Sequence, residues 1–183
     1  MRVDQTGLTR GVRVPSVKPM VQARAETAPD TSVDGLRVMT FGMVVLLLVQ
    51  MGIGMVVNLF VGIPDAHPGA HPANYFSGSA SSVAWAITQP QSVLTAHVVL
   101  GLALIVTSIA IAVRAVQIGG ATVGVTAVIG ALLVIGAAFN GASFLDFSTN
   151  DSSLIMALLA LAAVLCYALV LLALPTRPTS ENT

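Results

Sequence analysis

The chain has 183 residues, of which only 9% are charged and 55% are hydrophobic. Soluble domains draw about a quarter of their residues from Asp, Glu, Lys and Arg, so this composition excludes an ordinary soluble fold. The formal net charge is zero, and no overall field attracts a polyanion, so we expect no nucleic-acid partner. The length is that of a single domain.

The segment 1–37 is polar and contains six of the eight basic residues of the chain. It has no aromatic residue and no apolar periodicity, so we expect a disordered cytoplasmic tail. Met20 lies within this segment. The sequence therefore leaves the translation start open between Met1 and Met20.

Four long apolar runs follow, separated by breaks at Pro64, Pro90 and Gly119-Gly120 and by the loop that ends at Asp151. About 20 apolar residues in a helix cross the ~30 Å hydrocarbon core of a bilayer. The sequence therefore predicts an all-α fold, a transmembrane four-helix bundle with up-down-up-down order and a disordered N-terminal tail. Its domain covers 38–175, followed by a cytoplasmic tail at 176–183, and its spans are 38–63, 92–114, 121–140 and 152–174.

The basic residues also predict an orientation. Beyond the six in the tail, Arg114 lies between the second and third runs and Arg177 follows the fourth. An excess of Lys and Arg marks cytoplasmic flanks. We therefore expect a multi-pass plasma-membrane protein with both termini in the cytoplasm, and with the loops 64–91 and 141–151 outside. Part of the first loop, about 79–89, is expected to form a short helix on the outer surface.

Small residues recur along the predicted spans. Because lipid gives helices no hydrophobic reason to associate, close packing of small side chains must hold such a bundle together. The third run carries Gly124, Ala127 and Gly130, and the first run spaces Gln50, Gly54 and Asn58 by four residues. We expect these faces to point inward, with Gln50 hydrogen-bonded between helices and with Leu and Val facing lipid.

Several polar side chains are predicted to lie at one depth. Asn58 is about five residues from the end of the first span, and His97 and Met156 are about five residues into the second and fourth spans. Asn140 is expected to close the third span. Ionisable residues inside a membrane are rare and are candidates for function. We therefore predict a cluster of Asn58, His97 and Asn140, which serves either as a ligand site or as a polar contact between helices.

Two cofactor alternatives remain open. Haem iron accepts His and Met ligands in helical bundles, and His97 with Met156 is the pair at compatible depth. We expect no cofactor, and haem b is the alternative. A metal in the first loop would use Asp65, His67 and His71, since imidazole suits Zn and Cu. Their D-x-H-x-x-x-H spacing is not a metal signature, so we expect these histidines to be solvated.

Short matches support a resemblance over about residues 40–172. They are Asn58-Leu59-Phe60-Val61, His67-Pro68-Gly69, Ala84-Trp85-Ala86, His97 followed by Leu100-Gly101, and Asn140-Gly141 through Phe144-Leu145. In these residues the chain resembles a group of small uncharacterised bacterial membrane proteins with four spans. The resemblance implies the four-helix architecture and a plasma-membrane location, and it brings no assigned reaction or functional residue.

The spans offer no nucleophile paired with a base, no phosphate loop and no paired carboxylates. We therefore expect no catalytic residue and no enzyme, but a non-catalytic accessory or interaction subunit. Its partners would be the lipid bilayer and either further copies of itself or a larger membrane complex. The alternatives are a haem-binding or redox-associated subunit that uses His97, and a small-molecule carrier or sensor with a pocket in the outer leaflet.

Overall fold

The computed structural model describes residues 31–90 and 92–175. Within these ranges the chain forms helices and no strand, which confirms the all-α prediction. The predicted tail residues 1–30 and 176–183 lie outside the described residues. The helices are α2 Thr31–Phe60, α3 Tyr75–Ile87, α4 Ser92–Ile118, α5 Gly120–Phe147 and α6 Asn150–Ala173.

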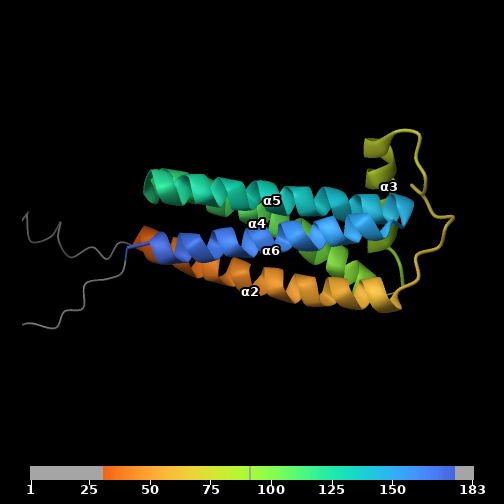
Figure 1. Cartoon of the computed structure of the whole chain (residues 1–183), viewed down its shortest axis with the longest axis horizontal. Coiled ribbons are helices and arrows are strands. Elements are labelled where there is room, and N and C mark those ends of the chain that lie inside the picture. Colours follow the sequence, from red (N-terminus) through yellow and green to blue (C-terminus); the bar gives the residue numbers. More distant parts are fainter. Residues whose placement is uncertain (1–30, 91, 176–183) are drawn as a thin grey trace, which may run out of the picture. The chain divides into compact units, whose positions relative to one another are not determined.

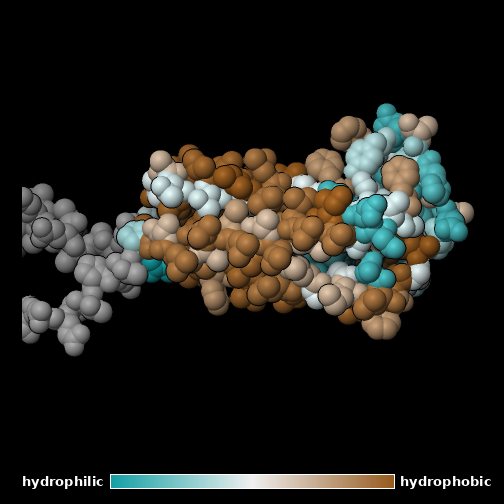
Figure 2. Space-filling model, in the orientation of Figure 1, coloured by the Kyte–Doolittle hydropathy of each residue, from teal (hydrophilic) through white to brown (hydrophobic). Residues whose placement is uncertain are grey.

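Helices α2, α4, α5 and α6 are long and apolar enough to cross a membrane. The shortest of them, α6, has 24 residues and is therefore about 36 Å long at 1.5 Å per residue, more than the ~30 Å of hydrocarbon. Their outward side chains are apolar, as at Leu132, Leu158 and Leu172, which are all exposed. Figure 2 shows this surface as a brown belt, with polar residues gathered near α3. The surface is compatible with a multi-pass membrane protein.

The four long helices lie side by side in the order α2, α4, α5, α6 around the bundle (Figure 1). Helix α4 packs on α5, and α5 packs on α6. The ring is closed by contacts of α2 on both sides, because Gln50 reaches His97 of α4 and Arg37 reaches Leu174 at the end of α6. Successive long helices run in opposite directions, so the up-down-up-down bundle is confirmed.

Small residues let the helices approach closely. A Cβ atom added at Gly130 of α5 would lie only 3.1 Å from Cζ of Tyr167 in α6. One added at Gly124 would lie 3.2 Å from the Cα atom of Val116 in α4. Gly124, Ala127 and Gly130 are all buried. The prediction that this face of α5 points inward is therefore confirmed, and its physical reason is the lack of side-chain bulk.

Helix α3 and the loop before it form a cap, residues 61–87, at one end of the bundle (Figure 1). Helix α3 packs on α4 and α5, and its Ala86 belongs to a buried cluster with Leu94 and Leu145. The loop folds back tightly on α3, since Gly69 has a φ of +94° and its backbone lies against Ser82. Only glycine adopts that φ without strain.

The helices extend beyond the predicted spans. Helix α2 begins at Thr31 rather than at 38, so residues 31–37 of the predicted tail are helical. Helix α4 continues past Arg114 to Ile118, where Gly119 and Gly120 end it, and α3 begins at Tyr75 rather than near 79. A helix end is set by its capping contacts, which hydropathy does not report.

Helix α5 gives the largest correction. It does not close at Asn140 but runs to Phe147, where Ser148 takes a left-handed conformation with a φ of 52°. The predicted outer loop 141–151 is therefore mostly helix. The helix was expected to end just before Gly141, but a Cβ atom at this glycine would lie 3.1 Å from Sδ of Met156 in α6. The glycine is needed for packing against α6, not for ending the helix.

Candidate functional site

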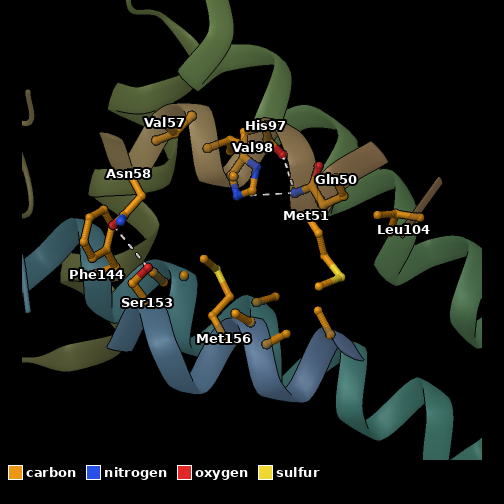
Figure 3. A pocket seen from close by; sticks show the side chains of 18 of the residues that line it. Gln50, Met51, Val57, Asn58, His97, Val98, Leu104, Phe144, Ser153 and Met156 are labelled. Atoms are coloured by element: carbon orange, nitrogen blue, oxygen red, sulfur yellow. Dashed lines mark hydrogen bonds between the residues drawn. The ribbon is translucent and has the colours of Figure 1, made fainter. Parts of the chain in front are cut away.

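A cavity of about 380 Å³ lies among α2, α4, α5 and α6 and reaches Val83 of the cap (Figure 3). Its walls are mostly apolar, and none of the described residues that line it is an Asp, Glu, Lys or Arg. The polar side chains on its walls are Gln50, Asn58, His97 and Ser153. Ligand pockets of proteins have volumes of about 300–1,000 Å³ and mostly apolar walls with a few polar groups. This cavity has those properties.

Gln50 and His97 connect α2 to α4 at the cavity. The Gln50 side-chain amide donates a hydrogen bond to the backbone carbonyl of His97, with an N···O distance of 2.9 Å. The same Nε2 atom lies 3.4 Å from Nε2 of the His97 ring. This confirms that Gln50 joins two helices, as predicted. An amide nitrogen can only donate, so the contact favours the tautomer in which His97 Nε2 accepts and Nδ1 holds the proton.

Two glycines make room for this pair. A Cβ atom added at Gly54, one turn after Gln50, would lie 2.8 Å from Cε1 of His97. One added at Gly101, one turn after His97, would lie 3.2 Å from Nε2 of Gln50. Each polar side chain therefore lies over a glycine of the opposite helix. A methyl group at either position would push the imidazole or the amide out of place.

The pair is not fully satisfied by the protein. Within the described residues, Oε1 of Gln50 and Nδ1 of His97 are enclosed and have no hydrogen-bond partner. A buried polar atom without a partner costs about 1–3 kcal/mol. Such a cost is unusual for a side-chain pair that only holds helices together, so the pair is a candidate for function.

Asn58 and Ser153 form a second polar contact at the cavity, between α2 and α6. Ser153 of α6 donates a hydrogen bond from Oγ to Oδ1 of Asn58 in α2, at 3.2 Å. Met156 follows one turn later on α6 and lines the same cavity. Figure 3 shows Asn58, His97 and Met156 around this space. The three side chains that were expected at one depth therefore all line this cavity.

Asn140 does not join this group. Its Nδ2 donates to the carbonyl of Gly136 on its own helix, at 2.9 Å, and it is not among the lining residues. Sequence reasoning had placed Asn140 at a helix end, whereas it lies inside α5. The site residue that the sequence did not indicate is Ser153, whereas Gly54 was expected on the inward face of the first span with Gln50 and Asn58. The signal for Gly54 and Gly101 is their spacing, because each follows a polar residue of the site by four positions.

Haem fits the cavity poorly. His97 and Met156 do face the same space, from α4 and α6. However, Nε2 of His97, a nitrogen that would bind iron, is turned toward the Gln50 amide. The two propionates of haem also require cationic or polar partners. Arg37 and Arg114, the Arg side chains that the structure describes, lie at the other end of the bundle.

The loop residues Asp65, His67 and His71 do not form a ligand set. Both ring nitrogens of His67 lie 3.0 Å from backbone carbonyl oxygens, those of Pro68 and Leu145, and neither is left for a metal. Across residues 31–90 and 92–175, no group of three or more His, Cys, Asp or Glu side chains is arranged to hold a metal ion.

Comparison of the chain with protein-family models, with curated proteins and with solved structures finds no significant match. The resemblance to four-span bacterial membrane proteins stays a prediction. What the geometry itself defines is a bundle of four apolar helices with a cavity between them and a short capping helix.

Proposed function

We propose that this chain is a non-catalytic integral membrane protein that binds a small, uncharged and largely apolar molecule, and that it acts as a carrier or a sensor. The cavity supports this proposal more than any other observation. It has about 380 Å³ of space, within the range of small-molecule sites, in a bundle whose helices elsewhere pack closely through glycine.

The chemistry of the walls supports an uncharged ligand. The described lining residues include no formal charge that would neutralise an ion, and a charge buried without a partner is very unfavourable. The polar groups Asn58, Ser153 and His97 suit one hydrogen-bonding group of the ligand. The wall formed by Leu104, Val134 and other apolar side chains suits its hydrocarbon body.

Native mass spectrometry tests the proposal on protein purified in mild detergent and incubated with a total extract of host membrane lipids. We expect a bound small molecule that survives release from the micelle. Ala160→Leu should abolish binding, because Ala160 lines the cavity and leucine fills part of it. Ala103→Leu makes the same change at an exposed position of α4 and should leave binding intact. Wild-type protein without any bound molecule, or equal binding by both variants, refutes the proposal.

The position of the arginines supports an orientation in the plasma membrane with both termini in the cytoplasm. Arg37 donates to the carbonyl oxygens of Leu174 and Pro175, and Arg114 lies beside Met39. Both described arginines are therefore at the end of the bundle opposite the cap, and basic residues favour the cytoplasmic side. A reporter enzyme fused after the C-terminal residue should be active only in the cytoplasm, and activity outside the cell overturns this orientation.

A second prediction is that the protein is an accessory subunit of a homo-oligomer or of a larger membrane complex. This role is compatible with ligand binding in the cavity. Recovery of the tagged protein with stoichiometric partners in mild detergent would support it, whereas recovery of monomer alone would count against it.

The haem alternative predicts a Soret band that His97→Ala removes. A colourless preparation of the folded protein ends that alternative.

A further inference from the structure

The cavity extends a long way along the bundle axis. Its lining residues run from Leu47 to Asn58 in α2, from Leu94 to Ile105 in α4 and from Val134 to Leu145 in α5. At 1.5 Å per residue, each of these stretches is about 16 Å long. One leaflet of a bilayer contributes about half of the ~30 Å hydrocarbon core. The cavity is therefore about as long as the hydrocarbon chain of a lipid in one leaflet.

The walls of the cavity change from polar to apolar along this length. Asn58 lies two residues before the end of α2, and Ser153 lies three residues after the start of α6, so their hydrogen bond is at the end of the cavity next to the cap. Leu47 and Leu104, at the opposite end, are apolar and buried. The amide and the imidazole between these two ends are turned toward each other. The order from polar to apolar is the order in which a lipid places its headgroup and its tail.

The cavity reaches the outer surface of the bundle between α2 and α6. Met55 precedes Asn58 by three residues and Ala157 follows Ser153 by four, so both lie one turn below the hydrogen bond that joins these helices. Both residues line the cavity and both are exposed, Met55 to 66%. Gly52 lines the same wall, and a Cβ atom there would meet nothing within 4 Å. Because the surface of the spans is apolar (Figure 2), a molecule dissolved in the bilayer can enter the cavity sideways.

The volume of the cavity also corresponds to one hydrocarbon chain. A water molecule takes about 30 Å³ in the liquid, and a methylene group is of similar size. The cavity volume of about 380 Å³ therefore holds about a dozen such groups. An extended chain of that many carbons is also about as long as the cavity. The two chains of a diacyl lipid need more space than the cavity offers.

We propose that the ligand is a single-chain lipid with an uncharged headgroup, which enters from the surrounding leaflet through the opening between α2 and α6. The inference rests on the proposed function and narrows it to one class of ligand. The headgroup binds at Asn58 and Ser153, and the chain extends toward Leu47. Oδ1 of Asn58 accepts the Ser153 hydroxyl, so the Asn58 amide nitrogen can serve the headgroup as a donor and the Ser153 oxygen as an acceptor. A hydroxyl headgroup, which both donates and accepts, suits this pair.

Native mass spectrometry with two defined probes tests the number of chains. Dodecanol has one chain and a hydroxyl group, and didodecanoylglycerol has two such chains and a hydroxyl group. We expect the full-length protein in mild detergent to bind one dodecanol, and an equal mole fraction of the diacylglycerol to leave that complex intact. Displacement by the diacylglycerol overturns the inference. Protein that binds a molecule from the lipid extract but not dodecanol overturns the inference and leaves the proposed function standing, whereas protein that binds neither overturns both.

Photolabelling of the wild type tests the orientation of the lipid and needs no variant to fold. One dodecanol analogue carries a diazirine next to its hydroxyl group, and a second analogue carries the diazirine at the end of its chain. The first should label the protein near Asn58 and Ser153, and the second should label it near Leu47 and Leu104. The reverse pattern, or the same pattern with both analogues, would overturn the proposal.

Three phenylalanine variants test the opening. Ala157→Phe places a ring between α2 and α6, and release of bound dodecanol should slow roughly ten- to a hundredfold, because the ring must be displaced before the chain can leave. Ala103→Phe makes the same change at an exposed position of α4 that does not line the cavity, and its release rate should match the wild type. Leu102→Phe enlarges the exposed lining residue of α4 and should also match the wild type. Unchanged release from Ala157→Phe, or slower release from Leu102→Phe, would overturn entry between α2 and α6.

Discussion

Replacing Gly54 by alanine tests the central contact of the cavity. The new Cβ atom would lie 2.8 Å from Cε1 of His97, well inside the distance at which two carbon atoms touch. The ring must therefore move away from α2. Because Gln50 Nε2 lies 3.4 Å from Nε2 of the same ring, the movement also separates that pair.

Gly52→Ala is the matched control, since a Cβ atom at Gly52 meets nothing within 4 Å. Both variants gain the same helix propensity, about 1 kcal/mol, so this term cancels in their comparison. Overpacking costs roughly 1–3 kcal/mol, and loss of a hydrogen bond costs roughly 0.5–1.5 kcal/mol. We therefore expect Gly54→Ala to be less stable than Gly52→Ala by about 3 kcal/mol.

The assay is unfolding in mixed micelles with increasing SDS, followed by the helical circular dichroism signal. Gly54→Ala should unfold at clearly lower SDS than the wild type, and Gly52→Ala should match or exceed the wild type. If the two alanine variants unfold together, the imidazole is not confined by Gly54 and the described geometry of the site is refuted.

Three further predictions concern other contacts and use the same unfolding assay. Gly130→Ala should destabilise the bundle by roughly 1–3 kcal/mol, because its Cβ atom would lie 3.1 Å from the Tyr167 ring, and an unchanged midpoint contradicts this. Arg37→Met should cost about 1–3 kcal/mol, since Arg37 donates to two carbonyl oxygens at the end of α6, whereas Arg37→Lys should cost less. Asp146→Asn should retain an acceptor for Ser79 and be at least as stable as the wild type, because Oδ1 of the buried carboxylate has no partner among the described residues. Asp146→Ala should be destabilised by about 1–3 kcal/mol, and equal stability of these two variants argues against the described hydrogen bond.

Part of the candidate site could be predicted from sequence because a helix converts spacing into depth. Asn58, His97 and Met156 were placed at one level by counting residues from the ends of their spans, and all three line the cavity. The prediction that Asn140 belongs to this cluster was wrong, because it assumed that the helix ends at Asn140. The true end at Phe147 depends on Ser148, which adopts a left-handed conformation.

The sequence offered a pocket in the outer leaflet as one alternative, but the size and the walls of the cavity could not be predicted. A helical wheel shows which face is small or polar, but it does not show whether two facing helices touch or stand apart. Gly130 and Gly141 both face α6, and the structure has close contacts at both, yet only Gly141 lines the cavity. The difference arises from all four helices together, because each position is fixed by packing against two neighbours.

The contacts of the cap were the part of the structure that the sequence predicted least. A short helix was expected near 79–89, but nothing in the spacing of the loop indicated that His67 stacks on Trp85 or reaches α5. These contacts join residues that are 18 and 78 positions apart. Only the folded chain brings them together.

What the amino-acid sequence decided alone was the helical class and the four apolar spans. Hydrocarbon cannot satisfy backbone hydrogen bonds, so long apolar runs must satisfy them internally, and a helix does so within one segment. This requirement is local and can be read from composition. The space between the spans, the pairing of Gln50 with His97 and the position of the cap depend on side chains from several helices at once. Those properties were decided only by the tertiary structure, because they arise from how the surfaces of different segments fit against each other.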